Sequence, residues 1–571
     1  MQEVGMKFKN TLSPKSRPKI NNDLYHMVKT GAENFGDKTL YFYDRNGTEN
    51  QFTYNDLLDH VNFIGTALSK YGLFGKHIAI VGDTCPEYIA SYLAVVNGNG
   101  VIVPLPKELS ADNLADFIKL SECEAIIYTK AMNKMMWDER ALFDGVRYFI
   151  PIEPDDMSDE KTLPYSRLLT EGSEMISAGN TVLTEHVIDK EKMCAIIFTS
   201  GTTGTSKGVM LNQRNLTTAA NSAGQSMQYD DDNTFISFLP PYHTYEMSIG
   251  QFAIMNLGAQ IKINSSLKRS IKDMASFKPN ALMLVPLFVE TMHKKVWDEI
   301  DKRGMRKKVR AAMKISDAML AAGIDMRKKF FGQITAAFGG NLKSIVCGGA
   351  AVNPEIIKDF HSFGILILEG YGITECSPLV SVNRPDGVRL KSVGTPVDGC
   401  TARIDVGDDG KTGEILVKGD NVMLGYYKNP EATAEVFTED GYFRTGDIGY
   451  MDEDGYIFIT GRKKNVIILS NGKNVFPEEI EEYIYKIPEV LESVVIGRKD
   501  ASGTPRITAI CVPDMTKFEG VENEEIEAKI RAEIAEMNKK LPTFKQVAVT
   551  EIRYEEFEKT PSRKIKRYKV Q

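Results

Sequence analysis

The stretch AIIFTSGTTGTSKGVML, residues 195–211, decides the fold. It opens with AIIF, a short apolar run bounded by polar residues, which is typical of a buried strand. A turn rich in glycine, serine and threonine follows this run. A glycine-rich turn that leaves a core strand lies where α/β sheets bind their ligands. We therefore expect a layered α/β protein with a binding site at this turn.

The turn has the composition of a phosphate-binding loop but not the spacing of a Walker A loop. That loop requires G-x-x-x-x-G-K-[ST], whereas Lys207 follows Ser206 and precedes Gly208. Successive backbone N–H groups of such a turn can form an anion nest, to which Lys207 adds a charge. The hydroxyl donors would be Ser200, Thr202, Thr203, Thr205 and Ser206. A flexible linker is the alternative, but the preceding strand favours phosphate binding.

Length and composition exclude several classes of protein. A chain of 571 residues exceeds one hydrophobic core, because cores stop growing near ~250–300 residues. The net charge of −7 argues against nucleic acid as the main partner. The cysteines have no C-x-x-C spacing, so they favour reduced thiols in the cytoplasm over a zinc site or disulfide framework. We expect neither a signal peptide nor a transmembrane span, because the sequence has no suitable apolar run.

Short apolar runs recur along the first two-thirds of the chain, and helix-like segments such as 54–71 and 85–97 separate many of them. Strands that alternate with helices indicate parallel α/β layers. The expected strands are IAIV (78–81), VIVPL (101–105), AIIY (125–128), AIIF (195–198), FISFL (235–239), ALMLV (281–285) and ILIL (365–368).

After Val393 the pattern changes. TARIDVGDDGKTGEILVKG, residues 401–419, is rich in turn residues and predicts a small β subdomain. From about Asn465 the chain predicts a compact α+β tail. Its strands are SVVIGRK and ITAICVP, and an amphipathic helix spans 524–541 with Asn523 as the expected N-cap.

The segment 291–330 is helical in pattern and unusually basic. A solvated helix face is the favoured interpretation, and a peripheral membrane contact is the alternative, since such clusters meet anionic lipid. The basic residues are Lys294, Lys295, Lys302, Arg303, Arg306, Lys307, Lys308, Arg310, Lys314, Arg327, Lys328 and Lys329.

Three further motifs carry side chains suited to chemistry. EGYGITECSP, residues 369–378, offers Thr374 as a phosphate donor and Glu375 as a hard oxygen ligand for Mg²⁺. Within 441–481, Asp447 could accept from two ribose hydroxyls and Arg462 could reach ribose or phosphate. EKTPSRKIKR, residues 558–567, is a basic tail. Taken singly, each is as readily explained as a turn, a surface ion pair or a basic C-terminus.

In this order, TSGTTGTSKGV, YGITE, RTGD, GRKKN and KTPSRKIKR resemble the core motifs of the adenylate-forming enzymes: acyl-CoA synthetases, peptide-synthetase adenylation domains and firefly luciferase. The resemblance covers nearly the whole chain. It implies that the glycine-rich loop closes over the β- and γ-phosphates of ATP without being a Walker A loop. By the same match, that loop consists of Thr199, Ser200, Gly201, Thr202, Thr203, Gly204 and Lys207.

The resemblance also implies a two-step reaction. A carboxylate attacks the α-phosphate of Mg·ATP to give an acyl-adenylate and pyrophosphate, and a thiol, usually of coenzyme A, then displaces AMP. Such chemistry needs cations aimed at the charge that develops during transfer. Lys564 matches the C-terminal catalytic lysine. Arg563 stands where the family usually has glycine, which puts the geometry of that loop in doubt.

Other roles follow from the resemblance, motif by motif. Thr374 would contact the α-phosphate, Glu375 would hold Mg²⁺, and Asp447 with Arg462 would bind ribose. The loop CGGAAV, residues 347–352, would flank the adenine, and LPPYHTYE, residues 239–246, would border the acyl pocket through its histidine. The residues expected to line the base or the acyl pocket are Gly349, Ala350, Tyr371, Gly372 and His243.

The resemblance further implies two domains, 1–461 for nucleotide and acyl binding and 462–571 as a mobile domain that carries Lys564. The hinge would be Lys464. One orientation would bring Lys564 to the ATP, and the other would bring Gly472 and Lys473 to the thiol tunnel.

Two features favour a long-chain fatty acid as the substrate. HTYE and the basic insertion at 291–335 are similar to those of bacterial long-chain acyl-CoA synthetases, and 235–289 is apolar enough to line an acyl tunnel. Acyl carrier protein is an alternative acceptor, although no long insertion between 447 and 477 limits the swing. A nucleotide sensor would be expected to lose Lys564, Glu375 or the loop lysine, and all are present. Luciferase-like oxygenation is a further alternative that the motifs alone do not exclude, and it is a rare outcome in the family.

Overall fold

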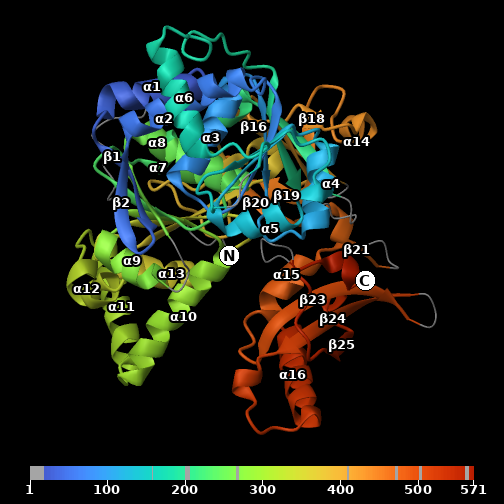
Figure 1. Cartoon of the computed structure of the whole chain (residues 1–571). Helices are drawn as coiled ribbons and strands as arrows, with labels where there is room; N and C mark the ends of the chain where they lie inside the picture. Colours follow the sequence, from blue (N-terminus) through green and yellow to red (C-terminus); the bar gives the residue numbers. More distant parts are fainter. Residues whose placement is uncertain are drawn as a thin grey trace. The chain divides into compact units, whose positions relative to one another are not determined.

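The computed structural model describes residues 19–156, 159–199, 206–264, 269–407, 410–469, 474–500, 504–559 and 565–570. The chain divides into two compact units (Figure 1). Unit 1 comprises residues 1–199, 207–401 and 417–437, and unit 2 comprises residues 200–206, 402–416 and 438–571. Unit 1 is a layered α/β body and unit 2 is smaller. This arrangement confirms the fold class expected from the alternation of apolar runs and helical segments.

The AIIF run belongs to a seven-stranded sheet in unit 1. Its central strands are parallel, and the antiparallel strands β8 and β18 extend one edge. The two strands β3 and β4 are almost wholly buried, as expected for a parallel sheet that is covered on both faces. In spatial order the strands are β18 (Gly425–Tyr426), β8 (Lys207–Asn212), β7 (Met193–Thr199), β4 (Val101–Leu105), β3 (His77–Val81), β5 (Ala125–Tyr128) and β6 (Tyr148–Pro151).

A nine-stranded sheet forms the second layer of unit 1. The strands from β13 to β1 are parallel, and the edges are antiparallel. The carboxyl ends of β9, β11, β12 and β13 therefore share one edge, where ligands bind in such sheets. The order is β15 (Thr395–Pro396), β14 (Leu379–Val382), β13 (Leu366–Gly372), β12 (Ser344–Cys347), β11 (Ala281–Leu284), β9 (Thr234–Ser237), β10 (Gln260–Ile263), β1 (Thr39–Arg45) and β2 (Thr48–Thr53).

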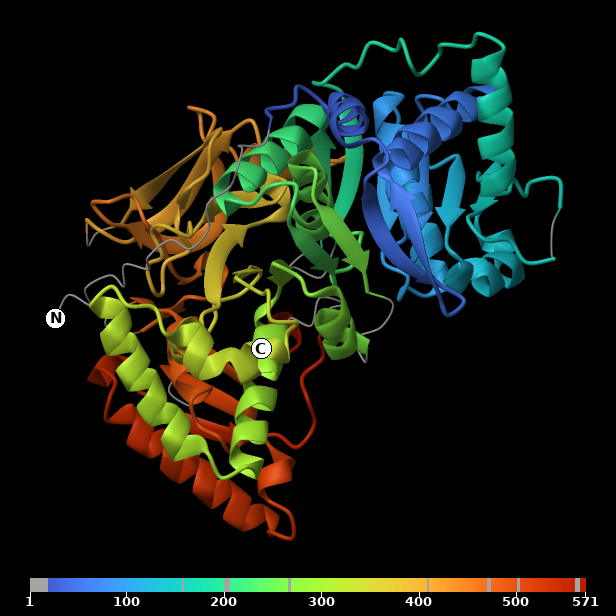
Figure 2. The same cartoon turned by 90° about the vertical axis from the view of Figure 1, so that its left-hand side faces the viewer.

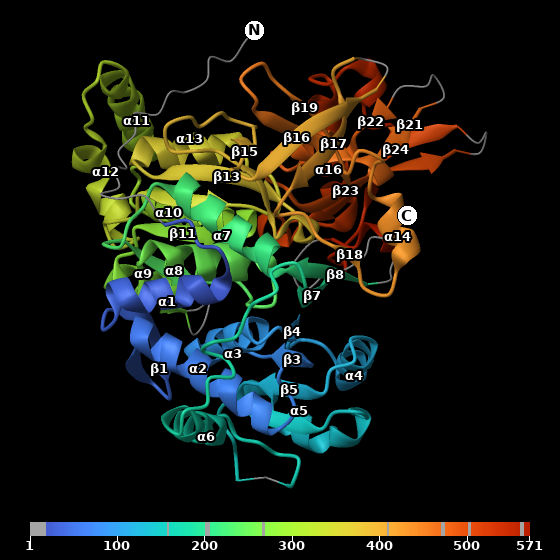
Figure 3. The ribbon, with the colours of Figure 1, turned by 90° about the horizontal axis from the view of Figure 1, so that it is seen from above.

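Buried helices fill the space between these two sheets. Helix α3 (Pro86–Asn97) is buried along its whole length, which fits a helix that is apolar on every side. Its Tyr92 ring lies 5.7 Å from the Phe252 ring of the π-helix η3 (Tyr245–Ala253). Figure 3 shows α3 and α8 between strands β3–β5 and strands β11–β13. Buried helices therefore contribute to the core of unit 1 together with its two sheets.

Local side-chain bonds fix where several helices of unit 1 begin. Asn212 caps α7 through a capping box with Asn215, and Thr53 caps α2 through a capping box with Asp56. The helices are α1 (Leu24–Phe35), α2 (Tyr54–Lys70), α4 (Ala111–Leu120), α5 (Asn133–Asp138), α6 (Tyr165–Ser177), α7 (Gln213–Met227), α8 (Ile254–Leu257), α9 (Ser270–Phe277), α13 (Pro354–Phe363) and α14 (Pro430–Glu435).

The basic segment forms three helices, α10 (Pro286–Lys302), α11 (Arg306–Ala321) and α12 (Arg327–Ala336), in unit 1. Figures 1 and 2 show α10 and α11 as a helical hairpin that extends away from the sheets of unit 1. Trp297, Ile300, Met313 and Phe331 are buried together with Phe363 of α13, so the hairpin has its own small core. The predicted helical character of this segment is confirmed.

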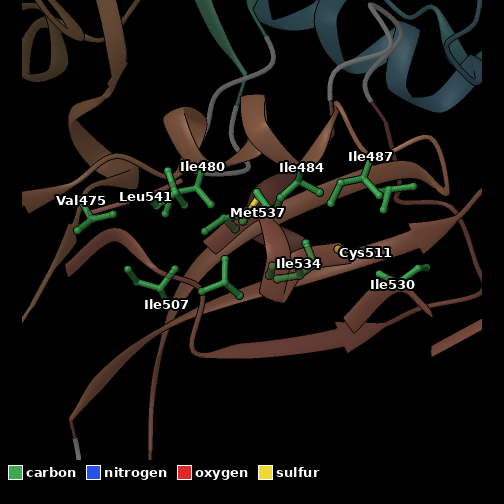
Figure 4. Packing of buried hydrophobic residues seen from close by; sticks show 14 of the residues in the cluster. Val475, Ile480, Ile484, Ile487, Ile507, Cys511, Ile530, Ile534, Met537 and Leu541 are labelled. Atoms are coloured by element: carbon green, nitrogen blue, oxygen red, sulfur yellow. The ribbon is translucent and has the colours of Figure 1, made fainter. Parts of the chain in front are cut away.

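Unit 2 contains the turn-rich β subdomain and the α+β tail. The subdomain is a four-stranded sheet, and the tail is a three-stranded sheet covered by two helices whose apolar faces pack as Figure 4 shows. Its elements are β16 (Cys400–Val406), β17 (Gly413–Gly419), β19 (Phe443–Met451), β20 (Ile457–Arg462), β21 (Ile467–Ile468), β22 (Asn474–Val475), α15 (Pro477–Ile484), β23 (Val490–Lys499), β24 (Pro505–Pro513), α16 (Asn523–Asn538) and β25 (Val549–Ile552).

One expected boundary in the tail is wrong. Asn523 is the first residue of α16, and the N-cap is Glu522, whose side chain makes no capping hydrogen bond. The acidic residues of the first turn, Glu524 and Glu525, favour the helix N-terminus through the helix dipole. Within the described part of the chain, no helix is long and apolar enough to cross a membrane.

Candidate active site

The base of the glycine-rich loop is a β-hairpin. Thr199 and Lys207 are paired at the ends of β7 and β8, and the Thr199 hydroxyl donates to the Lys207 carbonyl over 3.4 Å. The expected phosphate-loop residues between them, Ser200, Gly201, Thr202, Thr203 and Gly204, lie outside the described residues. The structure therefore places the two ends of the loop at the edge of the seven-stranded sheet.

A short chain of contacts joins the loop lysine to the expected metal ligand. Lys207 Nζ lies 4.6 Å from the centre of the Tyr426 ring, and the Tyr426 hydroxyl donates to Glu375 Oε1 over 3.0 Å. Strand β18 brings Tyr426 to this position because it pairs with β8, where Tyr426 faces Val209. Burial, followed by the charge of Glu375, raises the pKa of Tyr426, so the phenol stays a donor.

The sequence motifs do not identify Tyr426 as a site residue. Its backbone segment contacts Glu375 a second time, because the Met423 N–H donates to the Glu375 carbonyl over 2.8 Å. Tyr426 and Glu375 are 51 positions apart in the sequence, so no local motif indicates their contact. Its only signal is the strand pairing of GYY with GVML.

Thr374 and Glu375 follow the carboxyl end of β13, in the 3₁₀ turn η5 (Thr374–Cys376). Before them, Tyr371 is buried and pairs with Ser381 of β14. Gly372 is required for a steric reason, since a Cβ there would lie 2.3 Å from the Pro378 carbonyl oxygen. The close approach of these two strands sets the turn that presents Thr374 and Glu375.

The loop expected to flank adenine follows the carboxyl end of β12. Gly349 has φ +93°, a conformation that favours glycine, and both Gly349 and Ala350 are exposed. The far end of the loop is fixed by the Val352 N–H, which donates to the buried Glu369 carboxylate over 3.0 Å. The near end is fixed by Tyr245, whose hydroxyl donates to the Val346 carbonyl over 2.9 Å.

His243 lies between the carboxyl end of β9 and the π-helix. Its ring is half-buried and lies 4.4 Å from the Tyr242 ring, and its carbonyl accepts the Met247 N–H over 3.1 Å. The structure thus brings His243, the adenine loop and Thr374 to the same edge of the nine-stranded sheet.

A buried carboxyl clasp holds the π-helix to this edge. Glu246 Oε1 accepts from Ser237 Oγ at 2.5 Å and from Gln251 Nε2 at 2.6 Å. Glu246 is 1% exposed, and within the described residues no cation pairs with it. Burial raises its pKa to about 7. This clasp was also missed, because a single glutamate in an apolar run has no distinctive spacing.

In unit 2, the expected ribose ligands meet directly. Asp447 of β19 and Arg462 of β20 face each other in the antiparallel ladder, and Arg462 Nε lies 2.6 Å from Asp447 Oδ1. The Asp447 side chain is 5% exposed, so the arginine supplies the countercharge that a buried carboxylate needs. The pair holds the carboxylate in one orientation, which suits acceptance from a diol.

The expected hinge residue follows this pair. Lys464 lies in the 3₁₀ turn η6 (Lys463–Asn465), and Asn465 Nδ2 donates to Glu478 Oε1 of α15 over 2.6 Å. Burial, followed by the nearby charges of Arg462 and Arg567, lowers the pKa of Lys464 to about 8. The backbone here changes from a strand to a turn within one residue.

Lys564, Arg563, Gly472 and Lys473 lie outside the described residues. Both flanks of the segment that carries Lys564 are described. Lys559 and Ile565 form an antiparallel bridge, and the Lys566 N–H donates to the Glu558 carbonyl over 2.8 Å. Arg567 makes an ion pair with Glu481 of α15, and it donates to the Val495 carbonyl over 3.1 Å.

Comparison with known proteins decides the family. A profile of the AMP-binding enzyme matches residues 28–427, and a profile of the AMP-binding enzyme C-terminal domain matches residues 464–571. The chain belongs to the AMP-binding enzyme family. It is therefore an adenylate-forming ligase, which confirms the resemblance that the five motifs carry.

Curated relatives and solved structures agree with this family. Long-chain-fatty-acid–CoA ligase FadD15 of Mycobacterium bovis is 30% identical over 462 residues, which are 78% of this chain and 74% of that protein. The chloroplastic long-chain-fatty-acid–[acyl-carrier-protein] ligase AEE15 of Arabidopsis thaliana is 26% identical over 575 residues, 87% of this chain and 77% of that protein. ATP-bound MatB from Rhodopseudomonas palustris shares the fold, with a TM-score of 0.73 at 23% identity over 96% of this chain and 98% of that one.

The family uses ATP, and the described residues include one group that fits its metal. Magnesium usually takes one or two carboxylates together with phosphate oxygens and water. Glu375 offers such a carboxylate, and its Oε1 is oriented by Tyr426. The carboxylate of Glu375, oriented by Tyr426 near Lys207, is a group that would suit a magnesium ion.

Proposed function

We propose that this AMP-binding enzyme activates a long-chain fatty acid with ATP and transfers the acyl group to coenzyme A. The products are acyl-CoA, AMP and pyrophosphate. The array of Lys207, Tyr426 and Glu375 at the phosphate loop is the observation that carries the adenylation step. The long-chain substrate rests on the names of the relatives, the basic insertion and the HTYE motif.

In the first step, a carboxylate oxygen of the acid bonds to the α-phosphorus, and the bond to the bridging oxygen of pyrophosphate breaks. Pyrophosphate leaves with the electron pair. Lys207 would contact the leaving phosphates, Thr374 the α-phosphate, and Lys564 the oxygens of both reacting groups. Magnesium held by Glu375 would offset phosphate charge. Asp447 with Arg462 would hold the ribose, and Gly349, Ala350, Tyr371 and Gly372 would line the adenine.

In the second step, the thiol sulfur bonds to the acyl carbon, the acyl–phosphate oxygen bond breaks, and AMP leaves with the electron pair. The thiol proton passes to solvent. Lys564 is needed only in the first step, so residues 462–571 would turn about Lys464 between the steps and bring Gly472 and Lys473 to the thiol. The functional boundary at 461/462 follows from this motion.

The acyl chain would lie along the apolar residues between 235 and 289, with His243 at the entrance. Many of these residues are buried, among them Ile236 of β9 and Ile249 and Phe252 of the π-helix. A cytoplasmic location is supported by the cysteines, none of which forms a disulfide in the described part of the chain.

A carboxylate screen tests this proposal. ATP–pyrophosphate exchange is measured with fatty acids of increasing length, and thioester formation is then measured with coenzyme A and with holo acyl carrier protein. We expect exchange with long-chain acids and a thioester with coenzyme A. Formation of ADP and phosphate would contradict adenylation, and exchange without any thioester would contradict the second step.

Acyl carrier protein is the second candidate acceptor, because the Arabidopsis relative is named for that acceptor. A thioester formed with holo carrier protein and not with coenzyme A would establish it. A chain that binds ATP but exchanges no pyrophosphate with any acid would instead be a nucleotide sensor.

A further inference from the structure

Helix α11 presents a surface with an unusual composition. Its solvent side is formed by residues at helical spacing, so they share one face about 120° wide. All are exposed, while Val309, Met313 and Ser316 face the protein on the other side. We call this surface the α11 face, and its residues are Lys307, Lys308, Ala311, Lys314, Ile315 and Ala318.

The α11 face carries no carboxylate. The sole acidic residue of α11 is Asp317, which lies off this face and accepts from the Ser362 hydroxyl over 2.9 Å. Among the described residues, none forms an ion pair with Lys307, Lys308 or Lys314. No ion pair therefore offsets the positive charge of these lysines, although acids three or four residues away could have done so.

The arginines of the same helix have a different task. Arg310 Nη1 lies 2.5 Å from Asp359 Oδ1, and its guanidinium stacks 4.1 Å from the Trp297 ring. His293 and Trp297 also hydrogen-bond Asp359, at 2.8 and 2.9 Å. Burial opposes ionisation of Asp359, but these bonds lower its pKa. The arginines thus hold α11 against the rest of unit 1, whereas the lysines of the α11 face make no ion pair among the described residues.

Apolar side chains are exposed beside the lysines. Ile315 on the α11 face is 54% exposed, and Ile324 after the helix is 52% exposed. At the start of α12, Phe330 is 42% exposed and follows Lys328 and Lys329, which also lack ion-pair partners among the described residues. Exposed aliphatic and aromatic groups beside lysines are the composition of helices that lie in a membrane interface.

We propose that the α11 face, with Ile324 and the start of α12, binds the surface of a membrane that contains anionic lipid. Lysine heads would meet lipid phosphates while Ile315 and Phe330 enter the interface. The net charge of −7 does not oppose this contact, because charges farther away than about 8–10 Å are screened at physiological salt. The use of the contact, namely collecting fatty acid from the bilayer, rests on the proposed function, but the contact itself does not.

Binding to vesicles tests the proposal directly. The full-length chain is sedimented with vesicles of phosphatidylcholine alone and of phosphatidylcholine mixed with phosphatidylglycerol. We expect binding only to the mixed vesicles, with a loss at high salt. Each lysine near such a surface contributes roughly fivefold, so Lys307→Glu with Lys308→Glu and Lys314→Glu should weaken binding by at least about 100-fold.

Helix α10 offers a matched control. Lys294, Lys295 and Lys302 are exposed and make no ion pair among the described residues, but they lie outside the α11 face. Changing all of them to Glu alters the net charge equally and should leave vesicle binding within about twofold. Equal losses in both charge-reversal variants would show general electrostatics and overturn the proposal. Ile315→Ser should weaken binding to the mixed vesicles several-fold at low salt, because it removes apolar area without changing the net charge.

Two further readouts separate this proposal from others. Light scattering of wild type and the α11 variant detects a second copy of the chain on this face, and a change of mass with no vesicle binding by the wild type would overturn the lipid proposal. Pyrophosphate exchange with a water-soluble medium-chain acid, and the melting temperature, should be unchanged in the α11 variant. Vesicle binding without exchange in the wild type would contradict only the proposed function.

Discussion

Glu246→Gln should make the stability of the protein less dependent on pH between about 4.5 and 7. Burial raises the pKa of Glu246 from 4.5 to about 7 in the folded chain. Below pH 4.5 the carboxyl is neutral in both states, so it makes no pH-dependent contribution. Between pH 4.5 and 7 the unfolded state ionises while the folded state stays protonated, and stability falls as pH rises. Above pH 7 the loss is complete.

The size of the effect follows from the same shift. A rise of the pKa to about 7 corresponds to about 3 kcal/mol at about 1.4 kcal/mol per unit. Glutamine has the shape of glutamate and can keep the bonds from Ser237 and Gln251 to Oε1. Its amide nitrogen would replace Oε2, which has no hydrogen-bond partner among the described residues. That replacement lowers stability by a constant amount, about 1–3 kcal/mol, at every pH.

The informative quantity is therefore how the stability difference between variant and wild type changes with pH, and not its size at one pH. Melting temperatures of wild type and Glu246→Gln are measured from pH 4.5 to 9, with exposed Glu160→Gln as the matched control. The difference in melting temperature between variant and wild type should move in favour of the variant by a few degrees, because unit 1 is larger than the domains of 150–250 residues that shift by about 2–4 °C per kcal/mol. A difference that stays constant across this range would refute a raised pKa at Glu246.

Three predictions concern the reaction. Tyr426→Phe removes the hydrogen bond to Glu375 but keeps the ring beside Lys207. It should therefore lower the rate of pyrophosphate exchange about tenfold and raise the magnesium concentration that exchange requires. Tyr427→Phe is the control, because the Tyr427 hydroxyl bonds Glu122 instead, and it should change neither quantity. Lys564→Ala should depress adenylation by about 10²–10³-fold while sparing thioester formation from supplied acyl-AMP, and equal losses in both half-reactions would contradict its role. Lys464→Pro should keep pyrophosphate exchange and abolish thioester synthesis, because proline fixes φ near −65° at the hinge; an unchanged ratio of the two rates in a folded variant would place the pivot elsewhere.

The layered architecture could be predicted because its buried strands are visible in the sequence as short apolar runs. The runs at 78–81 and 101–105 are short, apolar on consecutive positions and rich in β-branched residues, which favours strands covered on both faces. Asn212 could be identified as a cap from the spacing of its own motif, since its partner Asn215 lies three residues away. The cap of α16 was misplaced by one residue, because the acidic first turn begins the helix without a side-chain cap.

The contacts of the site could be predicted only in part. Motif spacing indicates Thr374 and Glu375, since both lie in one turn, but it says nothing about Tyr426, which strand pairing brings in from 51 residues away. The pair Asp447 and Arg462 is likewise set by the register of β19 and β20. Motif spacing shows which residues close in sequence act together. Contacts between residues far apart in sequence depend on the register of the strands.

The π-helix shows how Glu246, which no motif indicates, can affect the position of His243, which a motif does indicate. Glu246 and Gln251 are five residues apart, so in an α-helix, at about 100° per residue, they would point about 140° away from each other. In a π-helix, whose hydrogen bonds join residues i and i+5, they lie one above the other, as their 2.6 Å contact requires. Ser237 ties the same carboxyl to the carboxyl end of β9. His243 lies in the chain between Ser237 and Glu246, so its position depends on a π-helical winding that the Glu246 contacts stabilise.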